Sequence, residues 1–321
     1  MAGRRRRRFV AATVAVLVPT LLGCSSGGGS DRSARRRPTT TTTRRRSVTT
    51  TSSTTPESTT TTSGSRTSGR RTASTNLGVD TATAGRCDVL DPARCLLPFP
   101  NDHFTVADAS ATTGRRVRLD PASMPVNSKG VRVDPTEWNR NDGFSPGAMI
   151  ETYVPGLDLG RTGAAPITDI GRSLRADAPI VLLDVDTGAR WPYFAELDAQ
   201  ADPAEGALLV IRPARNLTEG HRYVVALRNL RTASGATIAA QRGFTIYRDR
   251  IATGNATLEA RRTHLDSVLN QLGAAGAARD SSLFLAWDFT VASERNLSSR
   301  MLHIRDDAFA SIGSEIGRAH V

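Results

Sequence analysis

Two segments have the Gly-x-Ser-x-Gly spacing with which serine hydrolases present a nucleophile on a sharp turn between a strand and a helix. Residues 23–27 straddle a cysteine and follow no predicted strand. Residues 143–147 place Pro146 directly after Ser145. The residue after the nucleophile must donate its backbone N–H to the oxyanion, and proline has no N–H to donate. The preceding residues 136–140 are mostly polar. We therefore predict a structured turn at 143–147 and assign no catalytic residue.

Histidines and acids could supply acid–base or metal chemistry, but their spacing forms no motif. Four of the five histidines are scattered without the close pairing of a zinc site, and the fifth, His320, lies in the segment 315–321; the four are His103, His221, His264 and His303. Asp184 and Asp186 begin a segment similar to a calcium loop, yet the later ligands are missing, including the final glutamate. We predict a turn there, structural roles for the histidines, no metal and no cofactor.

The first 24 residues have the pattern of an export signal. Arg4 to Arg8 are basic, and residues 9–22 are apolar and too short to span a bilayer comfortably. The stretch Leu21-Leu22-Gly23-Cys24 resembles the lipobox of bacterial lipoproteins. That resemblance implies cleavage before Cys24, attachment of membrane lipid to its thiol, and a location on the extracytoplasmic face of the cell membrane. An uncleaved signal anchor is the alternative, and the choice between Sec and Tat export stays open.

Two further cysteines, Cys87 and Cys95, bracket a short loop. Outside the cytoplasm such a pair persists as a disulfide. Their spacing does not fit a CxxC redox site, and no histidine cluster nearby suggests zinc. We predict that they pair and fix the start of the folded domain.

The basic charge of the chain is confined to its beginning. The formal net charge is +11, but residues 1–86 carry 16 arginines against three acids and the remainder carries net −2. A basic face for nucleic acid is therefore not expected on the folded part. Residues 25–86 are rich in Ser, Thr, Gly and Arg, a composition that stays disordered. We predict a tether there, whose arginine clusters at 35–37 and 44–46 could contact anionic lipid or wall polymer; a plain solvated spacer is the alternative.

From residue 87 onward the pattern is mainly that of β-structure. Strands are predicted at 179–185, 191–197 (its hairpin partner), 207–212, 222–228, 244–247 and 280–291. One amphipathic helix is predicted after Asn255 as N-cap, with a stop at Gly273, because Leu258, Leu265 and Leu272 share a face. Short strands separated by Gly and Pro favour an antiparallel immunoglobulin-like sandwich over residues 87–247. The helix and last strand at 248–314 would lead, through a connection at 301–309, to a further domain.

A family resemblance supports that division. Residues 213–220, 223–227 and 230–235 resemble bacterial Ig-like repeats, and residues 97–102, 141–145, 194–198 and 286–290 are similar to the N-terminal region of bacterial virulence-factor lipases. That resemblance implies a β module before an α/β-hydrolase domain with a serine nucleophile. The chain would then be the β module of a surface-anchored lipoprotein, with its own C-terminal hydrolase (esterase or lipase) domain as partner. A non-enzymatic tethered adhesion or cell-wall-binding module is the alternative.

The last residues have a separate explanation. Residues 315–321 are what the codons GAG ATC GGA AGA GCA CAC GTC would encode, and that string resembles a common sequencing adapter read in frame. We hypothesise that the natural chain departs near Ser314 and that the sequence is a fragment. These residues are excluded from fold reasoning.

Overall fold

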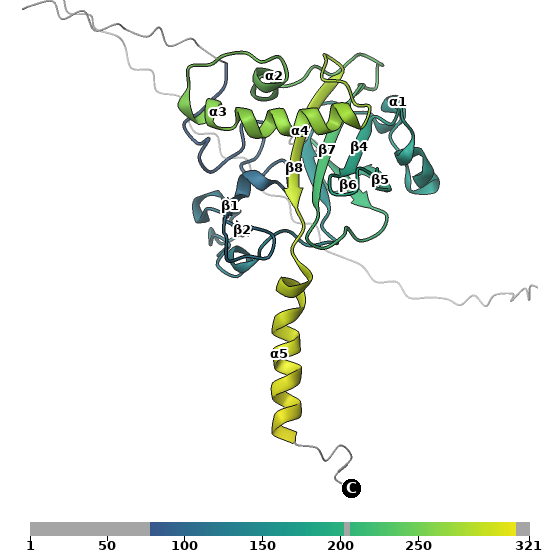
Figure 1. Ribbon diagram of the computed structural model, residues 1–321. Coiled ribbons are helices and arrows are strands. Elements are labelled where there is room, and N and C mark those ends of the chain that lie inside the picture. The colour runs from purple at the N-terminus through teal and green to yellow at the C-terminus, as the bar shows by residue number, and fades with distance from the viewer. Residues whose placement is uncertain (1–77, 202–205, 313–321) are drawn as a thin grey trace, which may run out of the picture. The chain divides into compact units, whose positions relative to one another are not determined.

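A computed structural model describes residues 78–201 and 206–312, which contain three antiparallel sheets (Figure 1). A two-stranded sheet joins β1 (Thr105–Ala107) and β2 (Arg115–Val117). The next sheet has the order β3 (Ile150–Tyr153), β6 (Leu208–Pro213), β5 (Tyr193–Leu197). The last has the order β4 (Ile180–Asp184), β7 (Arg222–Arg228), β8 (Leu283–Thr290). The prediction of a mainly β, antiparallel structure is confirmed at this level.

The described residues contain more helix than the single amphipathic helix expected from the sequence. The α-helices are α1 (Leu159–Thr162), α2 (Arg242–Arg248), α3 (Ala256–Ala260), α4 (Arg262–Ala274) and α5 (Glu294–Ile312). Short 3-10 helices are η1 (Asp102–Phe104), η2 (Pro121–Ser123), η3 (Trp138–Arg140) and η4 (Ile167–Leu174).

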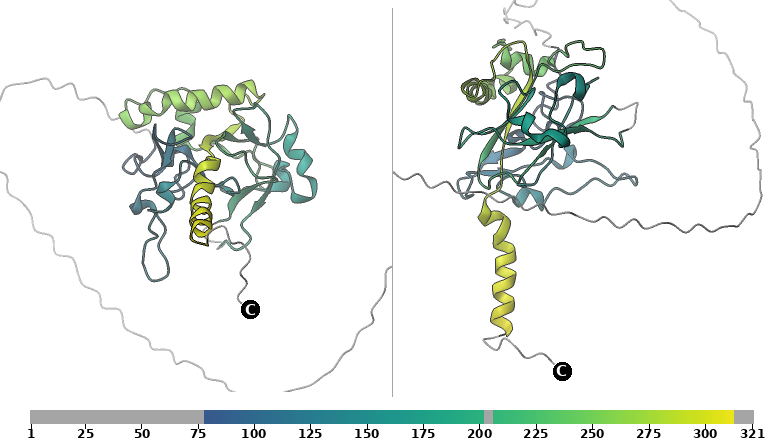
Figure 2. Two further views of the ribbon diagram at one scale, coloured as in Figure 1. Left: turned by 60° about the horizontal axis from the view of Figure 1, so that its bottom comes forward. Right: turned by 90° about the vertical axis from the view of Figure 1, so that its right-hand side faces the viewer.

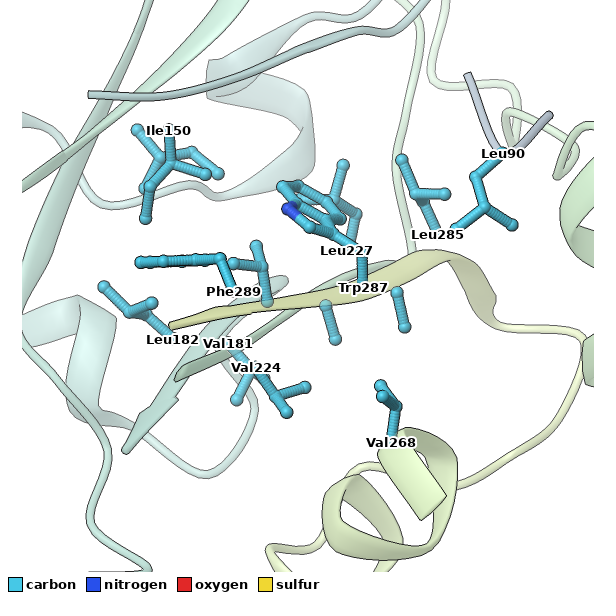
Figure 3. Close-up of a cluster of buried hydrophobic side chains, with 14 of the residues drawn as sticks. Leu90, Ile150, Val181, Leu182, Val224, Leu227, Val268, Leu285, Trp287 and Phe289 are labelled. Atoms are coloured by element: carbon cyan, nitrogen blue, oxygen red, sulfur yellow. The ribbon is translucent and has the colours of Figure 1, made fainter. Parts of the chain in front are cut away.

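The β4–β7–β8 sheet is the core of the domain because both of its faces are covered. Every residue of β4 and β8 is buried, which explains why these strands read as unbroken apolar runs. Figure 3 shows Trp287 and Phe289 on the side of β8 that faces Ile150 of β3, and Val268 of α4 on the other side. A hydrogen bond from Tyr193 Oη to the Ile180 carbonyl (2.7 Å) connects β5 to β4.

The expected hairpin between residues 179–185 and 191–197 is wrong, although both strands exist. The hairpin starts, since Trp191 N–H donates to the Leu182 carbonyl at 2.7 Å. Pro192 follows, and proline has no N–H with which to continue a ladder. β5 instead pairs with β6, and β4 pairs with β7.

The strand predicted at 244–247 is also wrong, because these residues belong to helix α2. Phe244, Ile246 and Tyr247 are all buried, which alternation along a strand would not produce but a short helix packed on α4 does. Four residues are too few for a pattern to separate the two periods. Gly243 permits the packing, since a Cβ there would lie 1.8 Å from the Val89 carbonyl oxygen.

The predicted helix after Asn255 is confirmed, as two segments. The Asn255 side chain accepts hydrogen bonds from the backbone of Thr257 and Leu258, as an N-cap should. Helix α4 continues through Gly273 to Ala274, so the predicted stop is one residue early, and Gly276 (φ +82°) takes the left-handed position beyond it.

Both ends of the described region differ from the expected boundaries. Residues 78–86, assigned to the tether, form turns in which Ala84 is buried. Residues 301–309, expected as a connection, lie inside helix α5. Cys87 and Cys95 form a disulfide in the structure. The predicted signal and Cys24, most of the tether, and residues 315–321 lie outside the described residues.

Candidate functional site

The segment 141–147, which contains the Gly-x-Ser-x-Gly spacing, lies where β8 ends and α5 begins. Phe144 N–H donates to the Thr290 carbonyl (2.9 Å), and Ala292 N–H donates to the Phe144 carbonyl (2.8 Å). Gly143 lies so close to the chain that a Cβ would be 2.5 Å from the Ala292 nitrogen. The turn is therefore built onto the junction between strand and helix.

Ser145 is held as a turn residue. Its Oγ accepts a hydrogen bond from Gly147 N–H at 3.2 Å. Over residues 78–201 and 206–312, no histidine forms a hydrogen bond with Ser145, whereas a serine nucleophile needs an adjacent base. The backbone around Ser145 also differs from a nucleophile elbow, in which a strand runs directly into the turn. Phe144 forms an isolated β-bridge with Val291, just beyond the end of β8, and no strand ends at Phe144.

An apolar cavity of about 260 Å³ opens beside this turn. Its walls include three aromatic and three aliphatic side chains: Phe99, Trp138, Phe144, Val117, Leu119 and Leu297. Phe99 and Phe144 pack edge to face, with ring centroids 5.3 Å apart. The half-exposed Trp138 and the α5 residue Leu297 bring the cavity lining to the surface.

Helix α5 extends away from the sheets (Figures 1 and 2). None of its 19 residues is buried. Its large apolar side chains are between 39% and 66% exposed: Leu297, Met301, Leu302, Ile304, Phe309 and Ile312. Leu297, Met301 and Ile304 have the i, i+4, i+7 spacing of one helix face. We name this face the α5 stripe. Exposed apolar area of this kind marks an interaction surface.

A second candidate is a polar cluster on β8, beside a cavity of about 190 Å³. The buried Asp288 carboxylate accepts from His264 Nε2 (2.8 Å) and Arg222 Nε (2.7 Å). Burial favours its neutral form, but the His264 and Arg222 side chains outweigh burial and lower the pKa of Asp288. Asp102 accepts from the Thr290 backbone (3.0 Å) and hydroxyl (2.7 Å).

Asp102 differs from Asp288 in its proton affinity. Burial, reinforced by the negative charge of Asp288, raises the pKa of Asp102 to about 6. Two acids whose environments push their pKa values apart are typical of acid–base sites. Here, however, the carboxylate oxygens of both acids accept hydrogen bonds from the domain itself, and these bonds fasten η1 and α4 to the sheet. The cluster therefore has a structural explanation.

Asp184, Asp186 and His221 are a third group, whose possible ligand atoms lie within 4.8 Å of one another. His221 Nδ1 contacts the buried Asp184 carboxylate at 3.0 Å. The Asp184 Oδ1 also accepts from the Asp186 and Thr187 backbone, and Asp186 accepts from Arg222 N–H (2.8 Å). These contacts form the turn predicted from the sequence, and we assign no ion to it.

The remaining histidines do not converge on one site. His103 lies in η1 near Asp88, and its side chain lines two neighbouring cavities. Burial lowers the pKa of His103. His303 is exposed on α5. The α5 stripe is not predicted from the sequence, because the expected connection at 301–309 hides it. Asp288 is not among the predicted site residues either, although an acid inside the apolar run 283–291 signals a buried charge that needs partners.

No family model matches the chain, and no curated protein matches it. In the described part of the chain, no helix combines the length and apolar character needed to cross a membrane.

Proposed function

We propose that this chain is the N-terminal β module of a surface-anchored lipoprotein and that it serves an α/β-hydrolase domain continuing the chain after α5. The observation that carries the proposal is the α5 stripe. Most of the stability of a helix in a protein comes from packing of its amphipathic face, and no residue of α5 is buried. Large apolar side chains along one face need a packing partner.

The proposed partner is a folded unit in the same chain. A domain attached beyond residue 312 is held next to the stripe by covalent connection, which gives it a high effective concentration there. The cavity at Trp138 and Leu297 adds a concave site at the root of the helix, where an apolar side chain of that domain fits. In this proposal the module positions and shields the hydrolase.

Catalysis is assigned to the partner domain. Ester hydrolysis needs an activated serine, its base and preorganised donors for the oxyanion. Ser145 is committed to a turn, and Pro146 cannot donate to an oxyanion. We expect the chain 1–321 by itself to leave short-chain p-nitrophenyl esters intact. Hydrolysis that a serine-directed inhibitor abolishes would refute this assignment.

The proposal extends to the fold family and the anchor. An immunoglobulin-like arrangement of the two three-stranded sheets is supported by their antiparallel pairing and by the Tyr193–Ile180 contact between them. Lipid on Cys24 and a spacer to residue 77 would hold the module at the extracytoplasmic face of the membrane.

The deciding experiment expresses the gene through its natural stop codon and compares the product with Met301→Glu and His303→Glu variants. Met301 lies on the stripe, whereas His303 lies on the opposite side of the same exposed helix. We expect esterase activity in the full product, one cooperative unfolding transition, and separation into two transitions for Met301→Glu only. A product without a hydrolase domain, or identical unfolding of all three proteins, would overturn the proposal.

A further inference from the structure

The first turn of α5 is capped by two segments of the chain. The Ser293 hydroxyl accepts from Asn296 N–H (3.2 Å), and the Ser293 carbonyl accepts from Leu297 N–H (3.0 Å). Ser293 is therefore the N-cap. In a local capping box, the side chain three residues after the cap would accept from the cap's own N–H. Here the Ser293 N–H donates to a residue outside the helix instead of to the Asn296 side chain.

Asp142 takes the missing role from 151 residues away in the sequence. Its carboxylate accepts from Ser293 N–H (3.0 Å) and from the Ser293 hydroxyl (2.6 Å). Asn296 Oδ1 in turn accepts from Asp142 N–H at 3.3 Å. Asp142 and Ser293 are both buried. A carboxylate at a helix N-terminus is also favoured by the helix dipole.

The neighbours of Asp142 leave this contact little freedom. Gly143 packs directly on the Ala292 backbone, and Phe144 is buried and hydrogen-bonded to the end of β8. The Thr113 hydroxyl donates to the Asp142 carbonyl. Beyond its first turn, α5 forms an ion pair with the rest of the domain through Arg300 and Glu137. Their charged atoms lie 3.7 Å apart, and both side chains are mostly exposed. Such a pair contributes little.

We propose that Asp142 is a positioning residue that clamps the root of α5 and fixes the direction in which the helix leaves the sheets. The clamp joins the cavity and the α5 stripe into one rigid surface, so that a partner meets both at once. The turn 141–147 thus orients the docking helix. The clamp gains its purpose from the proposed function, but it is measurable in this chain alone.

The test measures the distance between spin labels on α4 and α5 by pulsed electron resonance. Labels are placed at Asn270→Cys and Ala310→Cys, both exposed positions, in a Cys24→Ser background. The disulfide between Cys87 and Cys95 leaves the two new thiols as the reactive ones. Three variants are compared with this parent: Asp142→Ala, Asn296→Ala and Asp158→Ala. Asp158 is the matched control, because it caps α1 through Arg161 N–H (2.7 Å) and does not touch α5.

We expect a single narrow distance peak for the parent and for Asp158→Ala, loss of that peak for Asp142→Ala, and partial broadening for Asn296→Ala. Should Asp142→Ala fail to fold by circular dichroism, Asn296→Ala decides alone, since it removes one acceptor at the clamp. A broad parent distribution, unchanged peaks in both clamp variants, or equal broadening in the control would overturn the inference. The spin-label distances are measured without the proposed partner domain. A failure of the hydrolase experiment under the proposed function would therefore leave the inference about Asp142 unaffected.

Discussion

Replacing Arg261 by methionine should strongly destabilise the domain, because Arg261 neutralises a fully buried acid. Its Nη1 and Nη2 atoms lie 2.6 and 3.0 Å from the two oxygens of Asp88. The Asp88 side chain is 0% exposed and the Arg261 side chain 18%. Asn101 Nδ2 donates to the same carboxylate at 2.7 Å. The pair fastens the disulfide loop to the start of α4.

The magnitude follows from burial. Removing one partner of a buried pair leaves an uncompensated charge, at a cost of about 3–5 kcal/mol in the free energy of unfolding. For a domain of this size that corresponds to a fall in Tm of roughly 6–20 °C. The double variant Arg261→Met with Asp88→Asn removes both charges and should recover most of the loss.

The pH dependence identifies the cause. Burial favours the neutral acid, but Arg261 outweighs it and lowers the pKa of Asp88. In the wild-type protein, ionised Asp88 therefore stabilises the fold above its unfolded pKa, and this stability is lost as the pH falls through the folded pKa. Without Arg261, burial raises the pKa of Asp88, so ionised Asp88 destabilises the fold until acid neutralises it. The gap between variant and wild type should narrow on acidification.

Urea unfolding followed by tryptophan fluorescence at several pH values measures these differences. Arg175→Met is the matched control. Arg175 contacts Asp177 through two similar hydrogen bonds (3.1 and 3.3 Å), but both side chains are mostly exposed. The control should change stability by less than about 0.5 kcal/mol. An Arg261→Met effect as small as the control's, or a gap that widens with acid, would refute the reasoning.

Three further predictions follow from other contacts. Gly143→Ala should lower the free energy of unfolding by about 1–3 kcal/mol, because its Cβ would meet the Ala292 nitrogen at 2.5 Å. Gly273→Ala, in open space on α4, should raise the free energy of unfolding by up to about 1 kcal/mol. Urea unfolding measures both changes, and equal effects would contradict the close contact at Gly143. The pKa of Asp102 is raised to about 6, so ionisation of its carboxyl group opposes folding above that pH. The free energy of unfolding should therefore rise by about 1 kcal/mol from about pH 7 to about pH 5, and the Asp102→Asn variant should lose that rise. A variant that keeps the full rise would exclude Asp102 as its source. Cys24→Ser should release the protein from the membrane fraction, as detergent phase partition measures, and continued membrane retention would exclude the lipid anchor.

Among the strands that the sequence located, three have the simplest burial. β4, β7 and β8 are covered on both faces and appear as apolar runs bounded by turn residues. Which strands pair was not predictable from the same pattern. One proline at 192 ended the obvious hairpin, and long-range packing chose the other partners.

Helices α2 and α5 were missed for opposite reasons. α2 is too short for its period to be read, and Gly243, which allows its close approach to Val89, looks like an ordinary turn residue in the sequence. α5 has the spacing of an amphipathic helix, yet none of its residues is buried in the described part of the chain. It was therefore missed by a search for helices that contribute to the core. The acid Asp288 did leave a signal, because a charge amid an apolar strand implies partners, but which partners depended on the fold.

The segment 143–147 has the spacing of a catalytic motif, and the structure gives other reasons for several of its residues. Gly143 is required by contact with the Ala292 backbone, and Phe144 by packing on Phe99. Ser145 accepts from Gly147 N–H within the turn, and the Pro146 carbonyl accepts from Leu217 N–H at 2.9 Å. Gly143 and Phe144 thus have structural causes of their own, and Ser145 and Pro146 take part in hydrogen bonds of the turn. A Gly-x-Ser-x-Gly match indicates a nucleophile only when a strand enters it, a helix leaves it and a base lies beside it, and here the base is missing among the described residues.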